Sequence, residues 1–299
     1  MNPETTHATS LLPFSSVAVA VAVAVAVAVV IVSTSGDERP KIWKLGGSTP
    51  EIISSILVRL DTIEILENAQ RVCRSWRGVC KEASMWRKIE MCKLVNLRRL
   101  GYGAEIMCRH AVDRSQGGLL EIDIWHFGTD ELLSYIADRS SNLRSLKLVM
   151  CNGITNKGLV EAVVKLPLLE YLEVSDSVSS LEVAGQSFPN LKTLKLNDSC
   201  ENRFEDDDDA MAIAESMPEL RYLQLRGNAL TDKGLNAILD GCLHLKRLDL
   251  RRCFDVHLDG DLKKRCYERI EDLRHPDDDL ADCYDLSGHL FYYLEKKKK

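Results

Sequence analysis

Aromatic and arginine side chains stand at comparable positions along the segment from residue 119 to residue 251, and their chemistry is that of molecular recognition. Tryptophan, tyrosine and arginine contribute most of the binding energy in protein–protein interfaces. We therefore predict that this segment binds another protein through a shared surface, with an exposed Trp125 as the strongest contact residue. The predicted contact residues are Trp125, Tyr171, Tyr222, Arg226, Arg247 and Arg251.

Catalytic chemistry has no comparable support in the sequence. The seven histidines are scattered, and no Gly-x-Ser-x-Gly, phosphate-binding or dinucleotide-binding glycine motif is present. The ten cysteines form no Cys-x-x-Cys pair, which indicates reduced core or turn residues of an intracellular protein and argues against a zinc site or a disulfide framework. The sequence predicts no catalytic residue, no metal and no cofactor.

A repeated leucine pattern, Leu-x-x-Leu-x-Leu, predicts the elements that position the contact residues. The first leucines of successive copies are 24, 26, 22, 29 and 25 residues apart, which is the period of leucine-rich repeats. One unit cannot bury its own leucines, so the units must stack with their strands in one parallel sheet on the concave side. The copies are Leu119-Ile122-Ile124, Leu143-Leu146-Leu148, Leu169-Leu172-Val174, Leu191-Leu194-Leu196, Leu220-Leu223-Leu225 and Leu245-Leu248-Leu250.

Two further features recur with the leucines. Thr129, Thr155 and Thr231 are predicted helix N-caps, because each precedes apolar residues at helical spacing. Three residues after the third leucine stands a small polar residue or a cysteine, which can turn inward and satisfy open backbone groups. This series is Cys151, Ser177, Ser199, Asn228 and Cys253.

Side chains that flank the second and third leucines should point to the concave face, because side chains alternate along a strand. The residue between those two leucines alternates in charge through most of the array. Cross-strand pairing of opposite charges would stabilise the sheet without any ligand. This series is Asp123, Lys147, Glu173, Lys195, Gln224 and Asp249.

The expected fold class is α/β, a solenoid of about six leucine-rich repeats that follows a small all-α domain of three helices. The acidic run 201–209 is predicted to be a solvated insertion at the start of a helix. The capping helix is expected to contain Leu262, Cys266, Ile270 and Leu273. The predicted segments are 1–39 (Val/Ala-rich N-terminus and linker), 40–92 (all-α domain), 93–118 (linker helix), 119–257 (repeats), 258–275 (cap) and 276–299 (tail).

The net charge and the hydropathy of the chain limit the classes of binding partner that we expect. A net charge of -6 argues against nucleic acid, because phosphate binding needs a concentrated basic surface. The apolar run Val17–Val32 is compatible with a signal sequence or membrane anchor. The first 16 residues contain no Lys or Arg, and the run alternates Val with Ala, so a low-complexity stretch without membrane contact is the favoured interpretation.

Three short amphipathic helices are predicted in the all-α domain. The first begins with Thr49 as N-cap and Pro50 at the first helical position. The second begins at Asp61 and Glu64, which fit a capping box. The third contains Val72, Cys73, Trp76 and Val79 on its apolar face.

These helices carry the residues Pro50-Glu51-Ile52, Ile56-Leu57-Val58-Arg59-Leu60, Val72-Cys73-Arg74-Ser75-Trp76 and Met85-Trp86, and their order and spacing resemble an F-box. An F-box followed by leucine-rich repeats is similar to the plant F-box/LRR proteins, from Trp43 to about His275. One departure is the opening Leu-Pro of the F-box pattern, whose place Gly46-Gly47-Ser48-Thr49 occupies. In the family that edge touches the adaptor.

The resemblance implies the substrate-recognition subunit of an SCF-type (Skp–cullin–F-box) ubiquitin ligase in the nucleus or cytoplasm, with no catalysis of its own. The F-box would bind a Skp-type adaptor, and through it a cullin, while the repeats hold an unidentified substrate protein for ubiquitination and degradation. The alternative is a membrane-tethered leucine-rich-repeat scaffold with a non-functional F-box. The implied adaptor-binding residues are Pro50, Ile52, Ile56, Leu57, Leu60, Val72 and Trp76.

Overall fold

Residues 50–92, 103–177, 188–197 and 206–279 are described by the computed structural model, in two units that divide between Met85 and Trp86. The apolar run Val17–Val32, the predicted cap Thr49 and the predicted turn residue Ser199 lie outside the described residues. Within the described ranges, no helix has the length and apolar character needed to cross a membrane.

In the first unit, α2, the consecutive elements α3, η2 and α4, and α5 correspond to the three predicted helices, and the second of them starts with the predicted capping box. Val72 was predicted in the third helix but lies in α4, at the end of the second. A short helix, η3, follows the third. The Glu64 amide donates to the Asp61 carboxylate at 2.7 Å, and the Asp61 amide donates to the Glu64 carboxylate at 3.4 Å. The buried core contains Ile53, Leu57, Ile63, Leu66, Ala69, Trp76 and Val79. The elements are α2 (Pro50–Leu57), α3 (Thr62–Glu64), η2 (Ile65–Ala69), α4 (Gln70–Val72), α5 (Arg74–Val79) and η3 (Ala83–Trp86).

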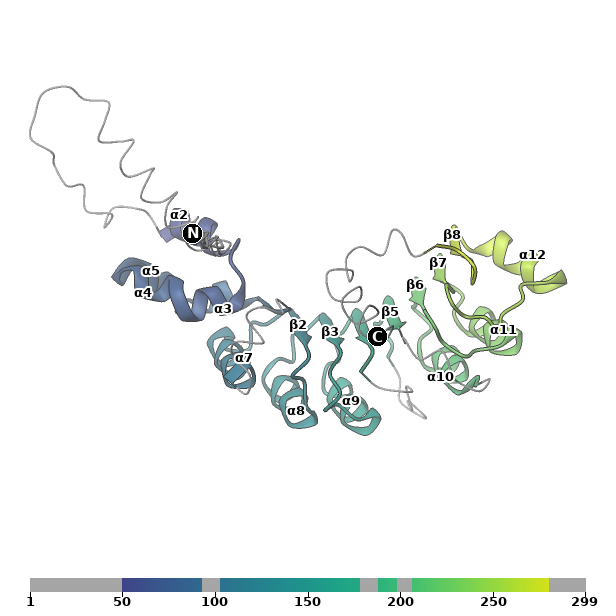
Figure 1. Ribbon diagram of the computed structural model, residues 1–299, viewed down its shortest axis with the longest axis horizontal. Coiled ribbons are helices and arrows are strands. Elements are labelled where there is room, and N and C mark those ends of the chain that lie inside the picture. Colours follow the sequence, from purple (N-terminus) through teal and green to yellow (C-terminus); the bar gives the residue numbers. More distant parts are fainter. Residues whose placement is uncertain (1–49, 93–102, 178–187, 198–205, 280–299) are drawn as a thin grey trace, which may run out of the picture. The chain divides into compact units, whose positions relative to one another are not determined.

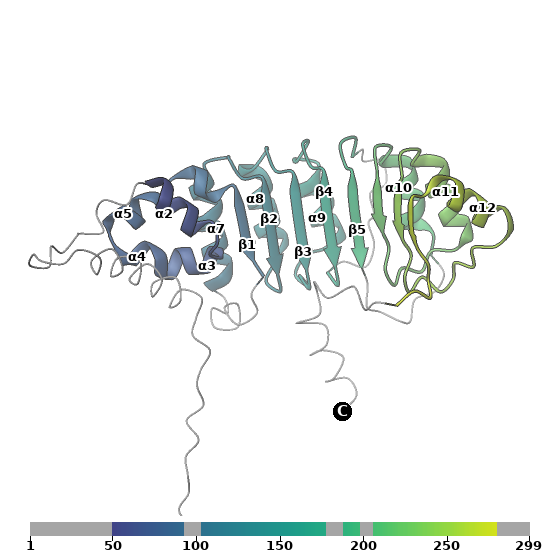
Figure 2. The same ribbon diagram turned by 90° about the horizontal axis from the view of Figure 1, so that it is seen from above.

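The second unit is built on a parallel sheet whose strands lie in chain order, so the predicted α/β solenoid is confirmed. Figure 2 shows the strands side by side with helices behind them. The sheet has eight strands among the described residues. They are β1 (Lys88–Met91), β2 (Glu121–Trp125), β3 (Ser145–Val149), β4 (Tyr171–Ser175), β5 (Thr193–Asn197), β6 (Tyr222–Gln224), β7 (Arg247–Asp249) and β8 (Asp272–Arg274).

Helices of this unit cover one face of the sheet, and among the described residues no helix lies on the other, open face (Figure 1). The predicted helix ahead of the first repeat is present as α7, and the acidic run ends in the first turn of α10, where Asp208 and Asp209 stand. Negative charge there is favourable because a helix N-terminus carries partial positive charge. The helices are α7 (Gly103–Ser115), α8 (Asp130–Arg139), α9 (Asn156–Val163), α10 (Asp208–Ser216), α11 (Asp232–Gly241) and α12 (Gly260–Arg269).

Strands β1 and β8 extend the sheet beyond the six predicted repeats. Leu273 was expected in the capping helix, and this prediction is wrong, because α12 ends at Arg269 and Leu273 lies in β8. The amides of Glu271 and Asp272 donate to the carbonyl of Lys246 at 2.8 and 3.2 Å, so pairing with β7 replaces the continuing helix. The other predicted cap residues, Leu262, Cys266 and Ile270, are buried as expected.

The repeated leucines form the core between sheet and helices. Leu146, Leu172, Leu194 and Leu223 are each 0% exposed and occupy the same position in neighbouring strands. Burying one such side chain contributes about 1.5–3 kcal/mol to the free energy of folding. Because the pattern repeats in register, the leucines of each repeat pack on those of the next and form one continuous core.

Inward-turning residues close the turns after the strands, as predicted. The Cys151 thiol lies 3.5 Å from the Ile124 carbonyl, and the Ser177 hydroxyl donates to the Ser175 carbonyl at 2.9 Å. The Asn228 side-chain oxygen accepts from the amide of Leu230 at 2.9 Å, and the Cys253 thiol donates to the carbonyl of Leu225. These bonds satisfy backbone groups that the bend away from the sheet leaves open.

The three predicted threonine caps are confirmed, and two of them also bind the preceding repeat. The Asp130 carboxylate accepts from the amide of Thr155 at 2.8 Å and from its hydroxyl at 2.7 Å. Asp207 accepts from the amide and hydroxyl of Thr231 at 2.8 and 2.9 Å in the same way. An acidic residue at one helix start therefore fixes the helix start of the next repeat.

Replacing Gly241 with alanine is expected to lower the free energy of unfolding of the repeat unit by about 1–3 kcal/mol. A Cβ atom at Gly241, the last residue of α11, would stand 2.1 Å from the backbone oxygen of Ala214 in α10, so the two helices would have to separate. Urea unfolding, monitored by hydrogen exchange of the repeat amides, measures the change in the free energy of unfolding. The control is Gly103→Ala, which meets no atom within 4 Å; equal stability of the two variants would contradict this expectation.

Candidate protein-binding surface

The open face of the sheet presents three columns of side chains, each running across the strands in register. The outer column is the most accessible, because the two residues at each of its ends are exposed and its other members are half-buried. The outer column is Lys88, Glu121, Ser145, Tyr171, Thr193, Tyr222, Arg247 and Asp272. The middle column is Glu90, Asp123, Lys147, Glu173, Lys195, Gln224, Asp249 and Arg274. The inner column is Trp125, Val149, Ser175 and Asn197, continued by Arg226 and Arg251 beyond the ends of β6 and β7.

Cross-strand charge pairing in the middle column is confirmed. The Lys147 ammonium lies 3.9 Å from the Asp123 carboxylate and 3.8 Å from that of Glu173. Lys195 lies 3.8 Å from Glu173 on the other side. These pairs join strands β2 to β5, and this column therefore stabilises the sheet whether or not a ligand is bound.

An acidic hollow lies over the first strands. It encloses about 170 Å³ and contains the carboxylates of Glu90, Glu121 and Asp123 against the ammonium groups of Lys88 and Lys147. Burial raises the pKa of Asp123 to about 6, although the charge of Lys147 favours its ionised form. Excess negative charge at this end favours a positively charged ligand group. The hollow is lined by Lys88, Ile89, Glu90, Glu121, Ile122, Asp123, Ser145, Lys147 and Tyr171.

Two predicted contact residues, Tyr171 and Tyr222, lie in the outer column and are partly accessible. The Tyr171 hydroxyl donates to the Glu173 carboxylate, and the Tyr222 hydroxyl donates to the Gln224 side chain at 2.8 Å. Burial, with the negative charge and the hydrogen bond of Glu173, raises the pKa of Tyr171 above its usual value. The ammonium of Lys195 lies 5.5 and 5.7 Å from the two ring centroids. Both rings are thus held in place for apolar contact.

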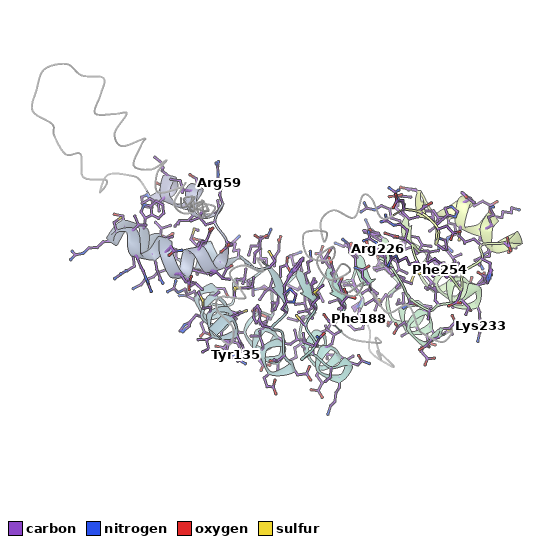
Figure 3. The ribbon with its side chains drawn as sticks, in the orientation of Figure 1. Arg59, Tyr135, Phe188, Arg226, Lys233 and Phe254 are labelled. Atoms are coloured by element: carbon purple, nitrogen blue, oxygen red, sulfur yellow. The ribbon has the colours of Figure 1, made fainter. Side chains whose placement is uncertain are left out.

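A basic cluster, formed by Arg226, Arg247 and Arg251, lies at the other end of the face. In Figure 3 Arg226 lies on the strand side, whereas Tyr135 and Lys233 lie among the helices. Asp249 accepts from Arg226 at 3.1 Å and from Arg251 at 2.9 and 2.7 Å. The Arg247 guanidinium stands 4.7 Å from the Tyr222 ring and makes no ion pair within the described part of the chain. Two of the three guanidinium groups, those of Arg226 and Arg251, therefore share the carboxylate of Asp249.

Two of the six predicted contact residues are buried. Trp125 is 6% exposed, so the expectation of an exposed tryptophan is wrong, and its indole N–H donates to Asp123 at 2.6 Å. Arg251 is 3% exposed and held by Asp249. The residue that follows each of them has a positive φ, which is 73° at His126 after Trp125 and 64° at Arg252 after Arg251. The chain turns sharply at this point, which encloses the inner column.

The same turn recurs at the end of most described strands. His126, Met150, Asp176, Gly227 and Arg252 all have φ between 50° and 73°. Each amide donates to a carbonyl of the following repeat at 2.8–3.2 Å, as from His126 to Val149. Left-handed backbone is unfavourable for residues other than glycine, so these bonds between repeats compensate a local strain.

In the first unit, the predicted adaptor-binding residues fall into two groups. Pro50, Ile52 and Val72 are exposed, Ile52 at 55% and Val72 at 45%, and Ile56 and Leu60 are half-buried. Leu57 and Trp76 belong to the core instead, at 0% and 4%. Val58 is a further apolar surface residue and is 65% exposed. It lies one residue beyond the end of α2.

Reactive groups are few on these surfaces. Burial raises the pKa of Cys108 and Cys253 to about 12 and that of Cys151 to about 11, so these core cysteines remain neutral thiols. Within the described ranges, no group of three His, Cys, Asp or Glu residues is arranged to hold a metal ion. The chemistry that the open face offers is charge complementarity and apolar contact.

Known families match both units. An F-box-like family model matches residues 50–91, and a Leucine Rich repeat model matches residues 139–161 and 217–239. Helices followed by repeats thus define an F-box protein with leucine-rich repeats. The chain is 60% identical over 256 residues to F-box protein SKIP19 of Arabidopsis thaliana, covering 83% of this chain and 84% of that protein. The chain belongs to the F-box/LRR-repeat family of plants.

The chain was also compared with a second plant protein and with a solved structure. F-box/LRR-repeat protein 23 of Arabidopsis thaliana is 62% identical over 234 residues, which are 76% of this chain and 52% of that protein. Among solved structures, the crystal structure of the Rad7 and Elc1 complex in yeast has a TM-score of 0.39 and 14% identity, covering 77% of this chain and 83% of that chain.

Proposed function

We propose that this protein is the substrate-recognition subunit of an SCF ubiquitin ligase in the nucleus or cytoplasm. The F-box unit binds a Skp-type adaptor and through it a cullin, and the repeat unit holds a protein for ubiquitination and proteasomal degradation. The chain catalyses no step; it raises the effective concentration of target lysines near the transfer machinery. The observation that carries the proposal is the presence, in one chain, of an F-box with exposed apolar residues and a repeat sheet with one face that no described helix covers (Figure 1).

The adaptor surface is proposed to consist of the accessible residues Pro50, Ile52, Ile56, Leu60 and Val72. Exposed apolar groups in a small helical unit are the type of surface that binds another protein. Leu57 and Trp76 act differently in this proposal, because they hold the helices in place from the core. Surface substitutions therefore test adaptor binding more directly than core substitutions.

Val72→Asp is expected to weaken binding of a purified Skp-type adaptor to the full-length chain at least about tenfold, because the substitution places a charge in an apolar interface. Val164→Asp is the matched control. Val164 is also an exposed valine, at 55%, but it lies at the end of α9 in the repeat unit. Isothermal titration calorimetry of both variants gives the comparison.

Equal losses in the two variants, or none in either, would contradict the assigned adaptor surface. If the folded wild-type chain binds no adaptor of this type, the ligase proposal fails as a whole. The alternative, a leucine-rich-repeat scaffold with a non-functional F-box, would then account for the open sheet face.

A further inference from the structure

The outer column of the sheet is uncharged over its central strands, β3 to β6, and we call this part the neutral row. At one end of it the Lys88 ammonium lies 3.8 Å from the Glu121 carboxylate, and at the other end Asp272 stands beside Arg247 in the sheet register. Because the charges at both ends are balanced, the row suits an uncharged segment of a ligand. Its members, all half-buried, are Ser145, Tyr171, Thr193 and Tyr222.

The two tyrosine rings of the neutral row are held in place by their own hydroxyl groups. Tyr171 donates to the Glu173 carboxylate, and Tyr222 donates to the Gln224 side chain at 2.8 Å. The two tyrosines occupy the same register position on β4 and β6, so two strand intervals of about 4.8 Å place them roughly 10 Å apart. Two apolar side chains of a ligand can therefore contact both rings only if they have this separation.

The separation of the rings restricts the conformation of a matching ligand. A polyproline II helix has about three residues per turn and rises about 3.1 Å per residue, so side chains three positions apart share one face and are roughly 9 Å apart. In a β-strand only residues two or four positions apart share a face, and these are about 7 or about 13 Å apart. An α-helix brings residues seven positions apart to about 10.5 Å. The polyproline II helix and the α-helix thus match the distance, and the β-strand does not.

Hydrogen-bonding groups beside the rings distinguish these two conformations. Strands β4 to β6 are paired on both sides, so a ligand that crosses them must use side-chain groups. The groups that remain are mainly donors, because the hydroxyls of Ser145 and Thr193 make no hydrogen bond within the described residues and the Lys195 ammonium lies 5.5 and 5.7 Å from the two ring centroids. The nearest acceptors, on Glu173 and Gln224, already bind the tyrosine hydroxyls.

A proline-rich segment has the complementary groups. Proline has no backbone N–H, and the carbonyl groups of a polyproline II helix make no internal hydrogen bonds and remain open to donors. An α-helix satisfies its own carbonyl groups and would leave the donors of the neutral row unmatched. The negative ends of the carbonyl dipoles also complement the ammonium charge of Lys195.

We propose that the neutral row binds a proline-rich segment of the target protein in the polyproline II conformation, with two prolines three positions apart that pack on Tyr171 and Tyr222. Carbonyl groups between these prolines accept hydrogen bonds from the Thr193 hydroxyl and the Lys195 ammonium. Surfaces lined by aromatic side chains bind such segments at low entropic cost, because the ligand conformation is preformed. This inference rests on the proposed function, in which the repeat unit holds the target.

The test is a selection of peptides by the full-length chain. A displayed library of random peptides of about twelve residues, or about four turns of a polyproline II helix, is passed over the protein, and the bound peptides are sequenced. The wild type is expected to enrich peptides with two prolines three positions apart. A double variant, Ser145→Tyr with Tyr171→Ser, keeps the same side chains in the row but separates the rings by three strand intervals, about 14 Å, and is expected to lose this preference.

Two control variants are expected to select the same peptides as the wild type. Tyr171→Phe retains the ring and loses only the hydroxyl that Glu173 binds. Tyr267→Ala removes a tyrosine of α12 that is 57% exposed and bonds to His275 at 3.1 Å, away from the neutral row.

Binding of one purified peptide selected by the wild type measures the contribution of each contact. Tyr171→Ala is expected to bind it at least about tenfold more weakly, because it lacks one of the two aromatic contacts. Thr193→Val keeps the shape of the side chain without its hydroxyl and is expected to bind it about two- to tenfold more weakly.

Absence of enrichment by the wild type, or enrichment of apolar residues at another spacing, overturns this inference. So does a double variant that still selects prolines three positions apart. Adaptor binding by the same proteins separates this failure from failure of the proposed function, because the substitutions lie in the repeat unit and should leave binding of the F-box unit intact. A chain that binds the adaptor but selects no proline-rich peptide keeps the proposed function and loses this inference.

Discussion

Replacing Asp249 with alanine is expected to lower the free energy of unfolding of the repeat unit by about 3–5 kcal/mol, because the change removes the carboxylate that forms an ion pair with the buried guanidinium of Arg251. Asp249 is 2% exposed and Arg251 is 3% exposed, and the two are joined by hydrogen bonds of 2.9 and 2.7 Å. Arg226 adds a further bond of 3.1 Å to the same carboxylate. Urea unfolding, monitored by hydrogen exchange of residues 220–250, measures the loss of free energy of unfolding.

A double variant separates the effect of losing the ion pair from the effect of losing packing. Asp249→Leu combined with Arg251→Met removes both buried charges and is expected to recover much of the stability, since apolar pairs can replace buried ion pairs. A double variant as unstable as Asp249→Ala would mean that the ion pair is not the cause of the loss.

The same pair predicts a dependence of stability on pH. Burial opposes ionisation of Asp249, but the hydrogen bonds from Arg251 and the charge of Arg226 outweigh it and lower its pKa. The folded protein therefore binds fewer protons at this site than the unfolded chain, whose aspartate pKa is about 4. The contribution is complete above that pH and is lost as the pH falls through the lower pKa of the folded state. Asp249→Ala should lack this component.

Trp76→Ala is expected to unfold the F-box unit. Trp76 is 4% exposed, and truncation of a buried tryptophan costs about 3–5 kcal/mol. A helical unit of this size buries little apolar surface, so we expect a loss of that magnitude to exceed its stability. Hydrogen exchange of the full-length chain should show loss of amide protection in residues 50–79, while residues 143–149 of the repeat core stay protected.

Trp76→Phe retains an aromatic ring and should keep most of the protection in residues 50–79. Val72→Asp should keep nearly all of it, because Val72 is exposed. In the proposed function, Trp76→Ala and Val72→Asp both lose adaptor binding, but only the tryptophan variant also loses its fold. Wild-type protection in Trp76→Ala would show that the helices do not depend on this side chain.

The sheet was predictable because the leucine pattern defines both strand position and register. Leu146, Leu172 and Leu194 occupy equivalent positions in the repeat, and the structure pairs them directly. Strands β1 and β8 were not predictable in this way. Each is defined by pairing with a neighbouring strand, as when Glu271 donates to Lys246, and this depends on residues distant in sequence.

The contact surface was predicted less completely than the fold. Alternation along a strand predicts which side chains point to the open face, and Tyr171, Tyr222 and Arg247 are accessible there. Alternation does not predict how far a side chain reaches into solvent. Trp125 and Arg251 are enclosed because the chain turns through a left-handed residue directly after them, at positions where neither His126 nor Arg252 gives the usual glycine signal.

The two terminal strands also affect how copies of the protein behave together. A parallel sheet with open ends could accept a strand from a second molecule and grow into a filament. Strand β1 has four residues and carries Lys88 and Glu90, and β8 has three and carries Asp272 and Arg274. Short, charged edge strands disfavour such growth. Strands β1 and β8, which the leucine pattern does not predict, therefore disfavour polymerisation of the protein through its sheet edges.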